Sequence, residues 1–141
     1  MSLASDLLAK PHSLTPASKY TVANGVGYLA AGVLLLVWPG ITQALFRDPA
    51  FAGKEEALMR VLGLTVVVIG WFYVFGGRSG SRQMVAASIV DRLLFVPLVL
   101  VPLALTGTFP HLLLSFAILD TSLALGAWAL LRRERPTSAA Q

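Results

Sequence analysis

The chain has 141 residues, of which 56% are hydrophobic and 13% are charged, and its formal net charge is +4. A soluble domain carries about 25% charged residues, so this composition excludes an ordinary water-soluble fold and favours a surface solvated by lipid. The absence of cysteine excludes structural disulfides, thiol redox chemistry and thiolate metal sites.

Four apolar segments are long enough to cross a bilayer, which takes about 20 mostly apolar residues in a helix. The first follows a polar N-terminal segment, 1–19, and lacks an Ala-x-Ala cleavage site, so we expect a retained span and not a signal peptide. The predicted spans are 20–38, 57–75, 84–105 and 111–131. Aromatic residues expected at the headgroup level lie toward the span ends: Trp38, Trp71, Tyr73 and Trp128.

The connections between these spans are short. Residues 41–56 place Arg47, Asp48 and Pro49 after an apolar stretch, which predicts a short amphipathic segment on the membrane surface. Residues 76–83 and 106–110 suffice only for hairpin turns, and the tail 134–141 has no periodicity and is expected to be mobile. The sequence therefore predicts one all-α transmembrane domain, an up-down-up-down four-helix bundle.

The basic residues predict the orientation of this bundle, because cytoplasmic loops retain an excess of Lys and Arg. One side of the predicted bundle collects Lys10, Lys19, Arg78, Arg82, Arg132, Arg133 and Arg135. The other side has only Arg47 and Lys54. We therefore expect both termini in the cytoplasm. Since these residues flank apolar spans and form no basic stripe, no nucleic-acid partner is expected.

Three ionisable residues fall inside predicted spans, where an unpaired charge costs at least about 2.5 kcal/mol. Arg92 and Asp120 come from neighbouring antiparallel spans at similar depth, so we expect an ion pair between them. The pair either joins two helices or forms a polar centre that binds a ligand or relays protons. Asp91 projects about 100° away from Arg92 around a helix, and we expect it to meet Arg60 or Asn24.

Two stripes of helically spaced residues add candidate contacts. The second span carries Arg60, Gly63, Val67 and Gly70, and the first span carries Asn24, Tyr28 and Gly32. Small residues allow close helix approach, so both stripes favour helix packing over a binding site. Arg60 lies near the end of its span, where its guanidinium can extend to the interface, which favours a structural role.

No catalytic or cofactor-binding motif accompanies these residues. The two histidines, His12 and His111, lie on opposite sides of the predicted bundle, so paired haem ligation within one chain is excluded. No metal-binding spacing, nucleophile elbow or phosphate-binding loop occurs. We expect no metal, no other cofactor and no autonomous enzyme.

Several short segments carry a resemblance to a known group. These are Glu56-Ala-Leu-Met-Arg60-Val-Leu-Gly63, Gly70-Trp-Phe-Tyr73, Asp91-Arg92-Leu-Leu-Phe and Leu119-Asp120. Over about residues 56–131 the chain resembles small four-span bacterial membrane proteins of uncharacterised function, DoxX-like or BphX-like. The resemblance implies a four-span fold in a bacterial inner membrane. It also implies a link to quinone or thiol redox systems or to aromatic-compound degradation, although a thiol role lacks its cysteine.

The leading functional hypothesis is a non-enzymatic membrane protein that acts as an accessory subunit or binds an apolar small molecule. The alternatives are a small proton-coupled transporter and a quinone-linked redox subunit. Small multidrug exporters are similar in size, but they use an acidic residue in their first span, and the first span here has none. The expected partners are the lipid bilayer, an apolar small molecule, and a membrane protein or a second copy of the chain.

Overall fold

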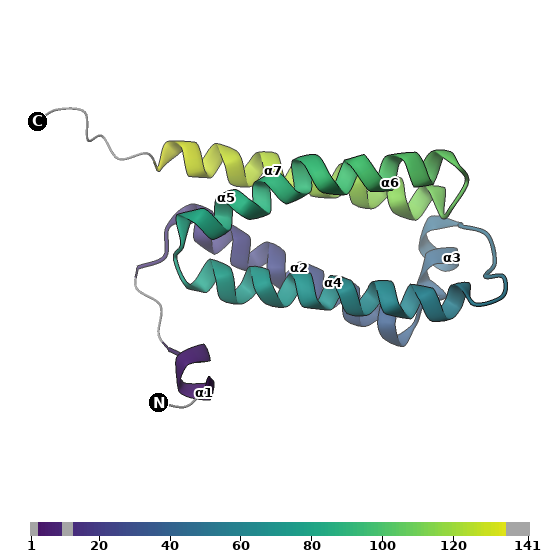
Figure 1. The fold of residues 1–141 in the computed structure, drawn as a ribbon, viewed down its shortest axis with the longest axis horizontal. Coiled ribbons are helices and arrows are strands. Elements are labelled where there is room, and N and C mark those ends of the chain that lie inside the picture. The colour runs from purple at the N-terminus through teal and green to yellow at the C-terminus, as the bar shows by residue number, and fades with distance from the viewer. Residues whose placement is uncertain (1–2, 10–12, 135–141) are drawn as a thin grey trace, which may run out of the picture.

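The computed structural model describes residues 3–9 and 13–134, and the regular secondary structure in these ranges is entirely helical (Figure 1). The elements are α1 (Leu3–Leu7), α2 (Pro16–Val37), α3 (Ile41–Phe46), α4 (Glu55–Arg78), α5 (Arg82–Val90), the π-helix η1 (Asp91–Phe95), α6 (Val96–Leu105) and α7 (Pro110–Arg133). Four helical segments are long and apolar enough to span a membrane: α2, α4, the continuous α5–η1–α6, and α7. They confirm the predicted all-α bundle of four antiparallel spans. The predicted tail, apart from Glu134, lies outside the described residues.

Two of the spanning segments begin with a capping side chain. The Thr15 side chain caps α2 by accepting a hydrogen bond from the Ser18 N–H at 3.2 Å, and Pro16 occupies the first turn. Ser81 caps α5 in the same way through the N–H of Met84 at 3.3 Å. Between 41 and 54 the chain forms only the six-residue α3, which is too short to span, as the sequence predicts; residues 55 and 56 already belong to α4.

The first hairpin pairs α2 with α4, and its two backbones are in contact. A Cβ atom added at Gly32 would lie 2.6 Å from Val67 N and 2.8 Å from the Gly63 oxygen. A Cβ atom at Gly25 would lie 2.8 Å from the Gly70 oxygen. These glycines recur at seven-residue spacing on both helices, which keeps them on one seam. The predicted role of Gly63 and Gly70 in close helix packing is confirmed.

The second hairpin, α5–η1–α6 against α7, is less regular. Pro97 has no N–H for the Leu93 carbonyl, and its ring crowds that carbonyl. In the turn before it the helix widens to a π-helix, in which the Val96 N–H donates to the Asp91 carbonyl. Pro102 removes a second backbone donor farther along α6. The backbone irregularity thus falls where Asp91 and Arg92 lie.

The two hairpins meet at both ends of the bundle. At the end that contains the start of α2 and the end of α7, an apolar cluster joins them: Ala17, Val85, Ile89, Ala127 and Leu131. At the α3 end a second cluster is built on Leu35, Met59 and Leu112, with Phe46, Phe51 and Phe109 packed against it. Figure 1 shows the two layers running side by side between these ends.

Large apolar side chains cover the outside of the spans. Exposed examples from each spanning segment are Val26 and Leu34, Leu64 and Phe72, Leu98 and Leu103, and Ile118 and Leu119. Water does not solvate such a surface favourably, whereas lipid does. Together with the four spans, this surface makes the chain a multi-pass membrane protein.

Candidate functional site

A group of polar side chains lies in the middle of the bundle, and we call it the tyrosine–carboxylate cluster. It consists of Tyr28, Tyr73, Asp91, Arg92 and Asp120. The Tyr28 hydroxyl donates a hydrogen bond to Asp120, and the Tyr73 hydroxyl donates to Asp91 at 3.1 Å. The two tyrosine rings meet edge to face, with centroids 5.4 Å apart. The cluster therefore connects all four spans.

Arg92 is fully buried and does not form the ion pair expected from the sequence. Its Nε donates to the Ser88 carbonyl at 3.0 Å and its Nη2 to the Ser88 hydroxyl at 3.3 Å. The guanidinium also lies over the Tyr73 ring, 5.0 Å from its centroid. Within the described residues it has no ion-pair partner, and its Nη1 has no hydrogen-bond partner. The predicted Arg92–Asp120 ion pair is wrong, although both residues belong to one cluster.

The prediction for Asp91 is also wrong in its partners. Asp91 accepts from Tyr73, and neither Arg60 nor Asn24 contacts it. Tyr73, expected at the membrane interface, is instead buried, with 5% of its surface exposed. Its hydroxyl bonds Asp91 and its ring lies beneath the Arg92 guanidinium, and both of these residues belong to the π-helix η1.

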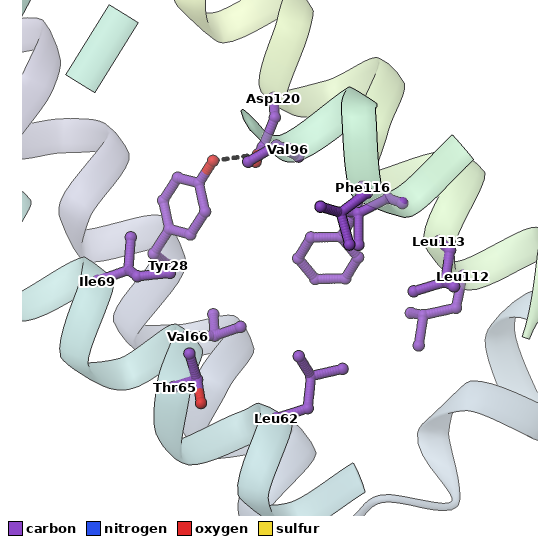
Figure 2. Close-up of a pocket in the computed structure, with 12 residues that line it drawn as sticks. Tyr28, Leu62, Thr65, Val66, Ile69, Val96, Leu112, Leu113, Phe116 and Asp120 are labelled. Atoms are coloured by element: carbon purple, nitrogen blue, oxygen red, sulfur yellow. Dashed lines mark hydrogen bonds between the residues drawn. The ribbon is translucent and has the colours of Figure 1, made fainter. Parts of the chain in front are cut away.

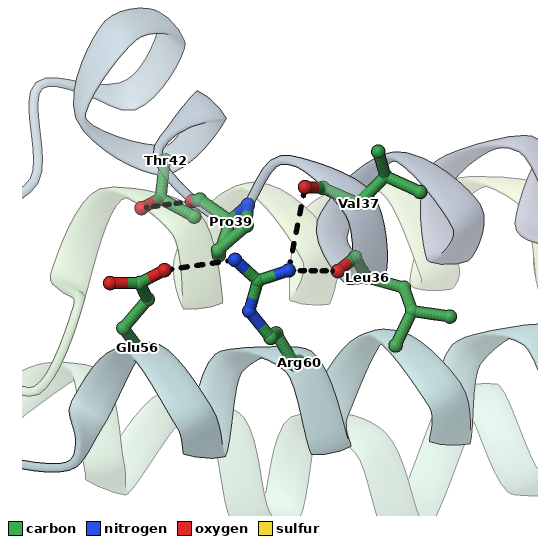
Figure 3. Close-up of polar contacts among 6 residues, drawn as sticks. All are labelled: Leu36, Val37, Pro39, Thr42, Glu56 and Arg60. Atoms are coloured by element: carbon green, nitrogen blue, oxygen red, sulfur yellow. Dashed lines mark hydrogen bonds and ion pairs between the residues drawn. The ribbon is translucent and has the colours of Figure 1, made fainter.

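Arg60 lies away from the cluster, near the α3 end (Figure 3). It donates to the Leu36 carbonyl at 2.7 Å and forms an ion pair with Glu56 at 2.9 Å. The Leu36 carbonyl belongs to the last turn of α2, where carbonyls lack helical partners. The structural role favoured by the sequence fits this geometry, since Arg60 closes the end of the neighbouring helix.

The predicted stripe on α2 divides between two neighbours. Gly32 faces α4, as described above, whereas Asn24 and Tyr28 line a hollow against Phe116 and Leu123 of α7. Asn24 is 9% exposed, and its Nδ2 has no hydrogen-bond partner in the described part of the chain. The stripe therefore does not form a single contact with one helix. Gly32 packs against α4, whereas Asn24 and Tyr28 face the second hairpin.

A cavity of about 160 Å³ lies between the two hairpins (Figure 2). One wall comes from α4 through Leu62, Thr65, Val66 and Ile69, and the others from Val96, Val99 and Leu100 of α6 and Leu112, Leu113 and Phe116 of α7. Leu62 and the Phe116 ring point into the space between the hairpins. Apart from the Thr65 hydroxyl, which is bonded to its own helix, the polar groups of the lining are Tyr28 and Asp120.

One carboxyl oxygen of Asp120 has no hydrogen-bond partner among the described residues. Oδ1 accepts from Tyr28, and among the described residues no other donor bonds the carboxyl group. Among the described residues, the fully enclosed side-chain polar atoms without a hydrogen-bond partner are Asn24 Nδ2 and Arg92 Nη1. Asp120 Oδ2 also has no partner but does not belong to this set, so it is not fully enclosed. Asp120 lines the cavity, so this unbonded oxygen belongs to a carboxyl group of the cavity wall.

Asp48 is a further polar residue that the sequence interpretation did not single out. It is buried, and its two carboxyl oxygens accept from the backbone N–H groups of His111 and Leu112, each at 3.1 Å. His111 Nδ1 also lies 3.3 Å from Oδ1. Asp48 thus caps α7 from the loop after α3. This contact joins the two hairpins next to the cavity, which Leu112 lines. The sequence did offer a signal for this role. Phe109, the residue before Pro110, has no side-chain group that could cap α7, so a capping group had to come from elsewhere in the chain.

The described residues hold no group of three or more His, Asp or Glu side chains placed to bind a metal ion. His12 lies outside the described residues. No family model, curated protein or solved structure matches this chain. The function must therefore be argued from the site itself.

Proposed function

We propose that this protein binds an apolar small molecule inside the membrane, in the cavity between its two hairpins. One observation carries the proposal: an apolar cavity at mid-span whose wall includes a buried carboxyl group with a free oxygen. Ligand sites are typically apolar hollows with a few placed polar groups. A cavity of this volume accommodates about one aromatic ring.

The arrangement of the hairpins supports this proposal. Apolar clusters and the Asp48 cap hold the hairpins together at both ends, so the space between them is maintained at mid-span. An intramembrane carboxylate is costly, and it is kept where it has a use. A purely structural bundle would be more stable with this cavity filled by a larger apolar side chain.

Native mass spectrometry of gently extracted protein tests the proposal. We expect a bound apolar molecule on the wild type and on Leu64→Trp, because Leu64 faces lipid and is 52% exposed. Leu62→Trp, two residues away on α4, should fill the cavity and abolish the bound molecule. Equal occupancy of the two variants would contradict the proposal. The same spectra report a co-purified partner subunit or a quinone.

The position of Asp120 favours a second candidate, a small proton-coupled transporter. A carboxyl group that faces an intramembrane cavity can exchange a proton with its surroundings. Proteoliposomes loaded with a pH-sensitive dye would show substrate-dependent proton flux for a transporter. Absence of flux in the wild type would leave binding without transport, and flux unchanged in Asp120→Asn would show that Asp120 does not carry the proton.

We further propose that both termini face the cytoplasm of a bacterial inner membrane and that the chain is related to DoxX-like or BphX-like proteins. The described ends of the bundle lie together, since Glu134 accepts from the Ala17 N–H at 2.6 Å. Arg78, Arg82 and Arg133 are at this same end. A reporter fused after Gln141 should behave as cytoplasmic, and periplasmic activity of that fusion would reverse the orientation.

A further inference from the structure

The ionisable side chains of the tyrosine–carboxylate cluster do not balance in charge. Arg92 supplies one positive charge, and Asp91 and Asp120 supply two negative charges when both are ionised. Tyr28 on α2 and Tyr73 on α4 are the other titratable groups that face Asp120 from the packed elements, and both donate neutral hydroxyl groups. In the low dielectric of a membrane interior, a net negative charge must be compensated. One positive charge, either a proton or a cationic ligand, is missing from the cluster.

Arg92 cannot supply this compensation by direct contact. Its Nε and Nη2 are bonded to Ser88, and it is fully enclosed, so the cavity does not reach it. Asp91 bonds Tyr73 and does not line the cavity. Asp120 is the one acidic residue among the lining residues, and its Oδ2 is free. The place for a cation is therefore the cavity beside Asp120.

We propose that the ligand of this cavity is a lipophilic cation: an apolar body of about one aromatic ring that carries one ammonium group. The ammonium donates to Asp120 Oδ2, and it replaces a proton that leaves for the solvent when the ligand binds. Leu62, Val66 and Phe116 contact the apolar body. This inference rests on the proposed function and adds the charge of the ligand to it.

The chemistry of the cavity separates a cation from its neutral analogues. A neutral alcohol also hydrogen-bonds to Asp120, but it carries no charge and cannot take the place of the proton. A carbonyl compound such as a quinone accepts a hydrogen bond from the protonated carboxyl group, and it too leaves the proton in place. An unsubstituted hydrocarbon gains apolar contact alone. We therefore expect the amine to bind more tightly than the alcohol and the carbonyl compound, and the hydrocarbon to bind most weakly.

Calorimetric titration of the purified protein in micelles, with empty micelles subtracted, tests this order with probes of nearly equal size. The probes are benzylamine, benzyl alcohol, toluene and benzaldehyde. At about pH 8 we expect benzylamine to bind at least tenfold more tightly than toluene, a difference of about 1.4 kcal/mol. Toward about pH 5 its affinity should fall, because benzylamine remains an ammonium and the higher proton concentration competes with it for Asp120. Toluene binding should not become weaker over this range.

The variants locate the effect. Asp120→Asn, which keeps the side-chain shape, should weaken benzylamine binding at least tenfold and leave toluene binding nearly unchanged. The inference is overturned if toluene or benzaldehyde binds the wild type as tightly as benzylamine. It is also overturned if the pH dependence disappears in Asp91→Asn and persists in Asp120→Asn. If Asp120→Asn does not fold, the probe order and pH dependence of the wild type decide alone. Failure of every probe to bind would instead count against the proposed function.

Discussion

The two hairpins of this bundle are built differently from the same kind of apolar sequence. In α2–α4 the backbones touch along a seam of glycines, both helices are regular, and the interface has little room for side chains. In α5–η1–α6 and α7 the helix path includes a π-turn and two prolines. Tyr28 and Tyr73 extend from the close hairpin to the carboxylates of the irregular one. The comparison indicates that close backbone packing supplies rigidity, whereas the irregular hairpin supplies ionisable groups.

The largest expected effect concerns the glycine seam. Gly32→Ala would place a Cβ atom 2.6 Å from the Val67 backbone nitrogen, so α2 and α4 must separate. We expect a loss of about 3 kcal/mol in the free energy of unfolding, the upper end for overpacking. Gly27→Ala on the same helix meets nothing within 4 Å and should be neutral or stabilising by up to about 1 kcal/mol. Equal effects of the two changes, in denaturant titrations in micelles, would remove the distinction between the hairpins.

The next effect concerns the contacts between the hairpins at the cluster. A double-mutant cycle with Tyr28→Phe and Asp120→Leu should give a coupling of about 1.5 kcal/mol, the upper end for a hydrogen bond. A cycle with Arg92→Met and Asp120→Asn should give less than about 0.5 kcal/mol, because the side chains form no direct bond. A larger coupling for the Arg92 cycle would restore the ion pair expected from the sequence.

A smaller effect is expected at the α3 end, where the hairpins are joined by Asp48. Asp48→Ala leaves the first N–H groups of α7 without acceptors and should cost about 1 kcal/mol, as for other lost helix caps. Hydrogen exchange should become faster in the first turn of α7 and stay unchanged near Arg133. Faster exchange spread evenly along α7 would show that Asp48 does not act as a local cap.

The smallest effect is expected at Arg60 and Glu56, whose ion pair is about half exposed. Glu56→Gln should change the free energy of unfolding by no more than about 0.5 kcal/mol, the usual value for such helical pairs. Arg60→Met should cost more than Glu56→Gln, because it also leaves the Leu36 carbonyl without its donor. If Glu56→Gln is the more harmful change, the ion pair and not the helix-end contact is the main role of Arg60.

Hydropathy and length sufficed to predict the spans, because a bilayer admits few alternatives to apolar helices. The packing partners were harder to predict. Adjacent residues such as Asn24 and Gly25 face different neighbours, α7 and α4 respectively. Which helix each residue faces depends on the seven-residue register between α2 and α4. The π-turn and the long reach of the Tyr73 side chain changed the partners of Asp91 and Arg92. The cavity and the free oxygen of Asp120 depend on how the hairpins are spaced, which no local pattern in the sequence specifies.

The most direct test of a ligand cavity between the hairpins is photolabelling in membrane vesicles, using a benzylamine with a photoreactive diazirine on its ring. Peptide mass spectrometry would then locate the labelled residues. A cavity between the hairpins predicts labels on Leu62, Val66 and Phe116, which unlabelled benzylamine in excess removes. Labels confined to lipid-facing residues such as Leu64, Phe72 and Ile118, and unaffected by that competitor, would contradict it.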